Sequence, residues 1–196
     1  KGTKTVNFNI RPATVTKLKV SSTGEKSVKL SWKKVTGADS YAIYRYDNTS
    51  KKWQRIKTVK AVSFTDSGLA RAKGYSYKVK AVKKTGGKEY ISASYSKAVE
   101  AVTKPAKASC TAKSAGSGSI EVSWKAVGGA SGYEIYSSSN GSDYVKSAKV
   151  GGSQKSAIVS GFEPYSLRMV KVRAYKTVNG KTSYGAFSQA VMVIVR

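Results

Sequence analysis

Hydrophobic and polar residues alternate along much of this chain with a period of two. In SVKLSW (Ser27–Trp32), the residues Val28, Leu30 and Trp32 fall on one face and small or charged residues fall on the other. The stretch Tyr75–Ala81 repeats the arrangement, with aromatic and aliphatic residues at every second position. Strict alternation over six or seven residues is typical of a strand with one buried face. Both stretches are therefore predicted to be β-strands.

Residue pairs that favour tight turns separate the alternating stretches. Examples are Gly86-Gly87, Gly128-Gly129, Asn140-Gly141 and Asn179-Gly180, and such pairs supply the positive backbone φ angles that short hairpin turns need. No stretch has a convincing helical period. About seven short strands in each half of the chain, joined by such turns, predict an all-β fold of immunoglobulin-like sandwiches.

The chain is a tandem duplication of one module. SWKKVTGADSYAIY at Ser31–Tyr44 recurs as SWKAVGGASGYEIY at Ser123–Tyr136. The segment YSKAV at Tyr95–Val99 recurs as FSQAV at Phe187–Val191. The order of the matched segments is the same in both halves, which is the pattern of stacked repeat units. The repeated Trp and Tyr residues are either a duplicated binding site or a duplicated core.

The repeat places the module boundaries. We expect a first module at residues 13–103 and a second at residues 104–196, because the junctions IRPA and TKPA stand before the two copies. Residues 1–12 alternate like a strand and end at the same junction, so they are interpreted as the last strand of a preceding module, with its linker. Pro105 stiffens the short connection between the copies, which predicts a semi-rigid spacer.

Each copy resembles a fibronectin type III module, and the resemblance covers almost all of residues 13–196. The marks in the first copy are Leu18, Trp32, Tyr41, and Leu69 followed by Tyr75. In that family the Tyr matching Tyr75 closes a corner by bonding nearby backbone. The second copy keeps Trp124, Tyr133 and Phe162, but carries Arg168 at the corner and Cys110 where the first copy has Leu18. Bacterial relatives of this kind are common in long secreted or cell-surface proteins.

The alternation and the resemblance together define an expected core. Trp32, Tyr41, Trp124 and Tyr133 lie on the apolar phase of their strands, so we interpret them as interior residues. Cys110 is expected to be a small buried apolar residue and not a reactive thiol. The full expected core is Leu18, Trp32, Tyr41, Leu69, Tyr75, Cys110, Trp124, Tyr133 and Phe162.

Tyr44 and Tyr136 lie on the opposite, outward phase. In the fibronectin-like arrangement they would share a sheet face with Lys78 and Lys80, or with Lys171 and Arg173. Two interpretations stay open. In the first, the face binds a polysaccharide or polyanion. In the second, which we favour, the Lys stems cover the Tyr rings while their ammonium groups stay hydrated. Trp53, matched by Tyr144, is a second candidate contact; the alternative, which we slightly favour, is that Trp53 packs over the sheet edge. The candidate ligand-binding residues are Tyr44, Trp53, Lys78, Lys80, Tyr136, Tyr144, Lys171 and Arg173.

The composition argues against an enzyme. The 196 residues include no His and a single Cys, so the commonest general base is missing and no intrachain disulfide can form. Ten acidic residues are scattered, and the chain contains no phosphate-binding loop, nucleophile elbow or C-x-x-C motif. We expect no catalytic residues, no cofactor and no metal. No apolar run is long enough to cross a bilayer, so no membrane insertion is expected.

The charge is the feature with most bearing on partners. There are 36 Lys and Arg residues and a formal net charge of +26, which attracts polyanions in a salt-dependent way. The cations are spread along the strands, and no aromatic–basic motif for specific nucleic-acid recognition is present. We expect a monomeric, extracellular or cell-surface, bacterial, non-catalytic spacer or adhesive module whose partners are other domains of its parent chain. The alternative is a module that binds cell-wall polyanion or polysaccharide through the basic and aromatic sheet face.

Overall fold

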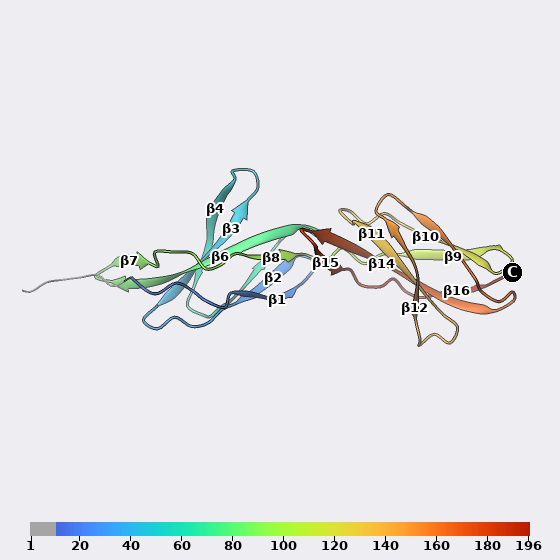
Figure 1. Ribbon diagram of the computed structural model, residues 1–196, viewed down its shortest axis with the longest axis horizontal. Coiled ribbons are helices and arrows are strands. Elements are labelled where there is room, and N and C mark those ends of the chain that lie inside the picture. The colour runs from blue at the N-terminus through green and yellow to red at the C-terminus, as the bar shows by residue number, and fades with distance from the viewer. Residues whose placement is uncertain (1–10) are drawn as a thin grey trace, which may run out of the picture. The chain divides into compact units, whose positions relative to one another are not determined.

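The computed structural model describes residues 11–196, which form strands, turns and loops with no helix among them (Figure 1). Residues 1–10, most of the predicted strand of a preceding module, lie outside the described residues. Nothing in 11–196 is a helix that could cross a membrane. The chain divides into two compact units. The first comprises the chain up to Thr23, Ser27–Ser67 and Tyr75–Ala101; the second comprises Gly24–Lys26, Gly68–Gly74 and Val102–Arg196.

Each module has eight strand segments. Those of the first are β1 (Lys19–Thr23), β2 (Ser27–Ser31), β3 (Ser40–Asp47), β4 (Lys52–Val59), β5 (Ser63–Ser67), β6 (Gly74–Thr85), β7 (Lys88–Ile91) and β8 (Val99–Val102). Those of the second are β9 (Cys110–Gly116), β10 (Ser119–Trp124), β11 (Gly132–Ser138), β12 (Val145–Gly151), β13 (Ser156–Ser160), β14 (Leu167–Val178), β15 (Lys181–Tyr184) and β16 (Val191–Ile194).

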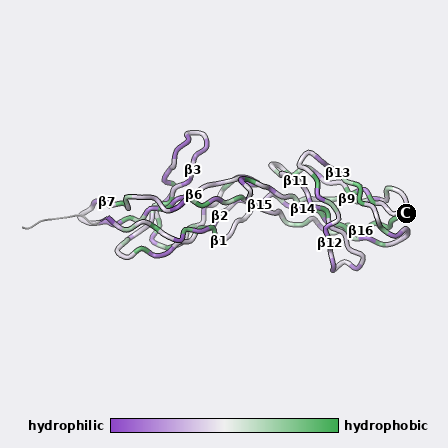
Figure 2. Tube along the Cα trace, in the orientation of Figure 1, coloured by the Kyte–Doolittle hydropathy of each residue, from purple (hydrophilic) through white to green (hydrophobic). Residues whose placement is uncertain are grey.

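The two modules share one sheet topology. In the first, β1-β2-β5 form a three-stranded sheet, and β4-β3-β6-β7 form a second sheet in which β8 also pairs with β6. In the second, the sheets are β9-β10-β13 and β12-β11-β14-β15, and β16 pairs with β14. The prediction of an all-β fold with two tandem sandwiches is confirmed. Figure 2 shows hydrophilic residues on the β3–β4 hairpin and hydrophobic residues along β16.

The last strand of each module is interrupted, which is why eight segments appear where about seven strands were expected. Between β7 and β8, Ser hydroxyl groups replace backbone carbonyls of a neighbouring strand as hydrogen-bond acceptors for the N–H groups of β6. The hydroxyl of Ser92 accepts a hydrogen bond from the Ala81 N–H at 3.2 Å, and that of Ser96 accepts one from the Val79 N–H at 3.0 Å. Ser188 does the same in the second module. The ladder can therefore break without leaving buried donors unpaired.

The duplicated aromatic residues lie in the interior. Trp32 and Trp124 are each 6% exposed, and Tyr41 and Tyr133 are 2% and 0% exposed. The ring of each Trp packs against the Tyr of the same module, with centroids 5.3 Å apart in the first and 5.1 Å apart in the second. In the second module the surrounding core comes from both sheets: Ile120, Val122, Ile135, Val159, Val170, Val172, Ala174, Val193 and Val195.

The two buried Tyr hydroxyls have the same partner in both copies. The hydroxyl of Tyr41 accepts the Val35 N–H at 2.9 Å, and that of Tyr133 accepts the Val127 N–H at 2.7 Å. Each bond reaches back to the loop six residues upstream. The loop between the second and third strands is therefore held against the core by a side chain, which gives a physical reason for the recurrence of this Tyr in both copies.

Four residues of the expected core are only partly buried. Leu18 and Cys110 are half-buried because Val15 and Ala108, 2% and 4% exposed, fill the interior positions just upstream. The Cys110 sulfur lies 3.1 Å from the hydroxyl oxygen of Ser188. The core contribution of these two residues was therefore overestimated.

Tyr75 and Phe162 are the other two half-buried residues. Tyr75 lies at the start of β6, where Arg45 covers its ring at 5.8 Å, and the next inward residue, Tyr77, is fully buried instead. Phe162 is covered by the guanidinium of Arg168 at 4.9 Å. The Arg that replaces the corner Tyr in the second copy therefore stacks over the neighbouring aromatic residue.

The first module contains an ion pair between its sheets that sequence reasoning missed. Asp66 on β5 is 7% exposed and accepts hydrogen bonds from Arg45 and from the Tyr77 hydroxyl, each at 2.8 Å. Burial and the Asp66 carboxylate raise the pKa of Tyr77, so this hydroxyl remains a donor. Burial alone would lower the pKa of Arg45, but the hydrogen bond and charge of Asp66 raise it. The second module has Ser137, Val159 and Val170 at these positions.

Candidate functional site

The outer face of the five-stranded sheet in the first module gathers the predicted basic and aromatic residues. We call Tyr44, Trp53, Lys78, Lys80 and Tyr95 the first ladder. The Lys78 ammonium lies 4.5 Å from the ring centroid of Trp53, and the Lys80 ammonium lies 4.3 Å from that of Tyr95. The Tyr44 and Tyr95 rings meet edge to face at 4.9 Å. Burial raises the pKa of the Tyr44 hydroxyl.

The second module repeats the arrangement. We call Tyr136, Tyr144, Lys171, Arg173 and Phe187 the second ladder. The Lys171 ammonium lies 3.5 Å from the Tyr144 centroid and 4.5 Å from that of Phe187. The Arg173 guanidinium lies 4.8 Å from Phe187, whose ring meets that of Tyr136 at 5.0 Å. Cations and rings therefore alternate across the sheet in both copies.

All eight predicted residues fall in the two ladders, four in each. Sequence reasoning missed Tyr95 and Phe187, although both begin the repeated segments YSKAV and FSQAV. They lie in the interruption before the last strand, where alternation cannot assign a face. Their recurrence as aromatic residues in the repeat was the signal that could have identified them.

The ladder geometry is that of Lys and Arg side chains covering aromatic rings. A cation over a ring contributes about 0.5–1 kcal/mol at an exposed site, and the long alkyl stems shield apolar surface. Lys80 also donates a hydrogen bond to the Ala93 carbonyl at 3.1 Å. These cations are therefore already engaged within their own module.

Beneath the second ladder lies a buried carboxylate, Glu134, only 1% exposed. It accepts two hydrogen bonds from Arg173, at 2.9 and 2.7 Å, and one from Lys146 at 3.3 Å. Burial would raise the pKa of Glu134, but these two cations outweigh it and hold the pKa below its usual range. Sequence reasoning missed this residue, which shares the outward phase of Tyr136 and replaces Ala42 of the first copy.

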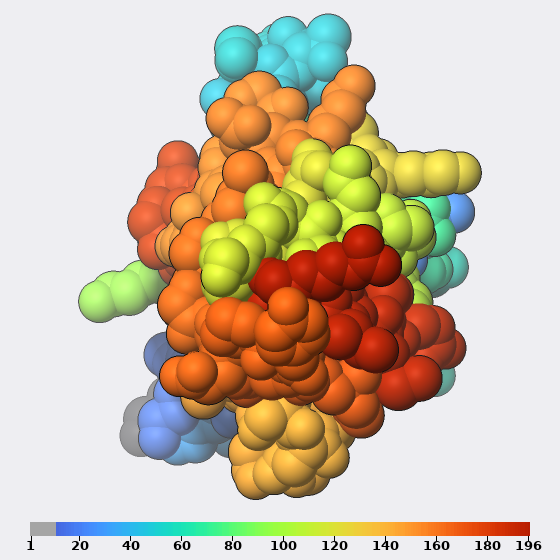
Figure 3. All heavy atoms as spheres, turned by 90° about the vertical axis from the view of Figure 1, so that its right-hand side faces the viewer, coloured from blue at the N-terminus to red at the C-terminus, as the bar shows by residue number. Residues whose placement is uncertain are grey.

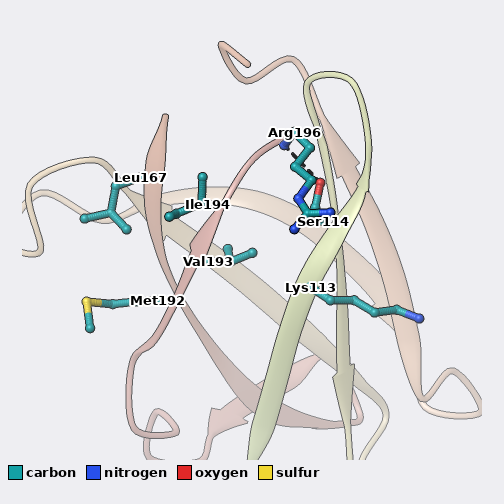
Figure 4. Close-up of a pocket in the computed structure, with 7 residues that line it drawn as sticks. All are labelled: Lys113, Ser114, Leu167, Met192, Val193, Ile194 and Arg196. Atoms are coloured by element: carbon teal, nitrogen blue, oxygen red, sulfur yellow. Dashed lines mark hydrogen bonds between the residues drawn. The ribbon is translucent and has the colours of Figure 1, made fainter. Parts of the chain in front are cut away.

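A hollow lies beside the C-terminal residues of the second module, at the end of the molecule that faces the viewer in Figure 3. It has a volume of about 670 Å³, and its lining residues, drawn in Figure 4, are Lys113, Ser114, Leu167, Met192, Val193, Ile194 and Arg196. Leu167, Met192 and Ile194 are 43%, 67% and 62% exposed. No site was predicted at this hollow from the sequence. The feature of the sequence that could have indicated this surface is the last strand, β16, which carries apolar residues at both its inward and its outward positions.

Comparisons with known proteins agree with the fold. No family model matches the chain. A poly(3-hydroxybutyrate) depolymerase of Ralstonia pickettii is 44% identical over 100 residues, which are 51% of this chain and 18% of that enzyme. The chain thus spans less than one fifth of that relative's length.

Two solved structures are also similar. A segment of two fibronectin type III domains from chicken tenascin matches with a TM-score of 0.55 and 17% identity, covering 92% of this chain and 99% of that one. The FN1–FN3 domains of chicken CNTN1 match with a TM-score of 0.46 and 19% identity, covering 95% of this chain and 68% of that one. The tenascin likeness shows a shared fold.

Proposed function

Because the chain is a pair of fibronectin type III-like modules, we propose that it acts as a non-catalytic spacer between other domains of an extracellular protein. The observation that carries the proposal is the position of the repeated aromatic residues. Trp32, Tyr41, Trp124 and Tyr133 are all buried, so what the chain duplicates is a fold. The most repeated residues therefore leave no reactive group at the surface.

The composition and the described contacts support a role without catalysis. The sequence has no His, and several of its few carboxylates are held in ion pairs, such as Glu89 with Arg55 and Asp66 with Arg45. The relative's name describes an enzyme that breaks down a polymer, and this chain matches only 18% of it. A spacer that separates a catalytic domain from another domain is the role that fits such a partial match.

The spacer proposal predicts a restricted distance between the modules. With Cys110→Ser as background, Thr65→Cys and Ser156→Cys place one spin label on an exposed strand position of each module. Pro105 and the short linker limit the conformations that the connection can adopt. We expect double electron–electron resonance to give a distance distribution about twofold narrower than when residues 104–107 are a Gly/Ser linker of equal length. Equal widths would contradict the spacer proposal.

A second candidate function is binding of an anionic wall polymer or polysaccharide. The observation in its favour is that the ladders repeat cations at matched positions, Lys78 with Lys171 and Lys80 with Arg173. In the first ladder Lys78 and Lys80 contact rings and a carbonyl. The nearby carboxylate of Glu89 on β7 is paired instead with Arg55 on β4 and with Lys84. A polyanion could therefore approach the Lys heads without first displacing a carboxylate.

Retention on a polyanion tests this second function. The pair Lys78→Ala and Lys80→Ala should weaken binding to teichoic acid about tenfold at low salt, because two adjacent cations are lost from one face. The matched control pair is Lys19→Ala and Lys29→Ala on the three-stranded sheet, which removes the same charge elsewhere. Equal losses from both pairs would mean that bulk charge alone attracts the polymer. Elution of the parent chain at physiological salt would also count against a binding face.

A further inference from the structure

The last strand of the second module, β16, is apolar on both of its faces. Val193 and Val195 point inward and are 8% and 0% exposed. Met192 and Ile194 occupy the outward positions and are 67% and 62% exposed. An antiparallel strand with one solvated face ordinarily carries polar residues there. The outward face of β16 therefore exposes apolar surface that the core does not require.

Leu167 extends this surface onto the neighbouring strand. It is paired with Ile194 in the β14–β16 register and is 43% exposed. We call Leu167, Met192 and Ile194 the apolar end patch. In Figure 4 the three side chains lie on the same side of β16, and Lys113 and Arg196 lie toward β9. The patch thus forms one wall of the hollow. Arg196 lies on the opposite side, whereas Lys113 points away from the patch and pairs with Glu121 at 3.0 Å.

The fold itself does not demand the patch. In the first module, Gly74 and Glu100 match Leu167 and Met192, and only the position of Ile194 stays apolar, as Val102. The same topology therefore forms with a glycine and a carboxylate at these positions. Contiguous exposed apolar residues on one module only are the usual mark of a contact surface and not of a core.

The residue types of the patch and the charge of the chain favour one kind of binding partner over others. A second copy of the chain would carry the same formal charge of +26, and like charges oppose self-association. A polyanion would gain little from Leu, Met and Ile side chains. An uncharged aliphatic polymer fits better, because its apolar groups can cover the patch while the side-chain N–H groups of Arg196 donate to its carbonyl oxygens.

We propose that the apolar end patch adsorbs the chain onto the surface of an aliphatic polyester. The inference rests on the proposed spacer function, since a spacer beside a polymer-degrading domain would lie close to the polymer. Poly(3-hydroxybutyrate), named as the substrate of the relative, has the required chemistry of methyl groups and ester carbonyls. The patch would then hold the second module against the solid surface without any reaction taking place there.

Adsorption of the purified chain to poly(3-hydroxybutyrate) film tests the proposal. The triple variant Leu167→Ser, Met192→Ser and Ile194→Ser should bind at least tenfold more weakly than the parent chain. The matched control is Val145→Ser with Ile158→Ser, two apolar residues that are each 66% exposed on other strands. The control should bind within about twofold of the parent, and circular dichroism should show native folding for both variants. Binding of the parent should persist in 1 M salt, because burial of apolar surface is not screened.

Several results would overturn the proposal. These are a parent chain that does not adsorb, a triple variant that binds like the parent, and a control that loses as much as the triple variant. Loss of parent binding in 1 M salt would assign adsorption to charge. Equal adsorption to polystyrene would show that the ester carbonyls play no role. If the parent chain dimerises and the triple variant does not, the patch is a self-association surface. None of these results alters the inter-module distance distribution, so failure here is separable from failure of the spacer function.

Discussion

Replacing Trp124 by Ala is expected to lower the free energy of unfolding of the second module by about 3–5 kcal/mol. Trp124 is 6% exposed, packs against Tyr133 and donates its indole N–H to the Gln154 carbonyl at 3.1 Å. Truncation leaves a large cavity between the two sheets and removes that hydrogen bond. Since domains are stable by only about 5–15 kcal/mol, the second module should unfold at much lower urea concentration, as followed by far-ultraviolet circular dichroism.

The matched Trp32 provides an internal control for the hydrogen bond. It is equally buried, but among the described residues its indole N–H has no acceptor. Phe keeps most of the ring volume and removes the N–H from both sites. Trp124→Phe should therefore cost about 1 kcal/mol more than Trp32→Phe, the net value of a typical hydrogen bond. Equal costs would show that the bond to Gln154 contributes nothing to stability.

Replacing Glu134 by Ala should destabilise the second module by about 3–4 kcal/mol, because it leaves the partly buried charge of Arg173 without its partner. Arg173 has 22% of its side chain exposed, against 2% for Glu134. Lys146 loses its contact as well, although it is half exposed and can hydrate. The double variant Glu134→Ala with Arg173→Ala should recover part of the loss in chemical denaturation. Suppose that the double variant is less stable than Glu134→Ala by the full loss of unfolding free energy measured for Arg173→Ala alone. The two side chains are then not energetically coupled.

Glu134 should also contribute to the acid sensitivity of the second module. The pKa of Glu134 is lowered in the folded state, so its stabilising contribution is complete above the unfolded-state pKa of about 4.3. The contribution is lost as the pH falls through the lower folded-state pKa. The difference in stability between the parent and Glu134→Gln should therefore shrink below about pH 4. A difference that is constant from pH 7 to pH 3 would contradict this assignment.

Much of the fold could be predicted from the sequence because alternation reports which residues of one strand share a face. The alternation places Trp32, Tyr41, Trp124 and Tyr133 inside, in agreement with the fibronectin-like resemblance, and Tyr44 and Tyr136 outside. Alternation no longer predicts which face a side chain occupies where the backbone leaves the regular strand conformation. Leu18 lies just after Lys17, whose φ is 55°, so the first strand offers fewer regular inward positions than its sequence pattern indicates.

The candidate surfaces were harder to predict, for two different reasons. Tyr95 and Phe187 complete the ladders from irregular segments, where no periodicity exists to assign a side. Glu134 lies on an outward phase and is nevertheless 1% exposed, because long basic side chains cover it. From the pattern of residue types along one strand, such a position is predicted to face solvent. The prediction fails because long side chains from neighbouring strands cover the position, and these are not part of the pattern.

The sequence by itself determined the secondary structure, the duplication and the inward or outward side of most strand residues, because these depend on spacing along one segment. Only the tertiary structure decided which strands meet. The Asp66–Arg45 pair joins β5 to β3, Arg168 covers Phe162, and Leu167 joins Ile194 in the apolar end patch. Contacts of this kind depend on register and on the packing of one sheet against another, which are properties of the folded chain as a whole.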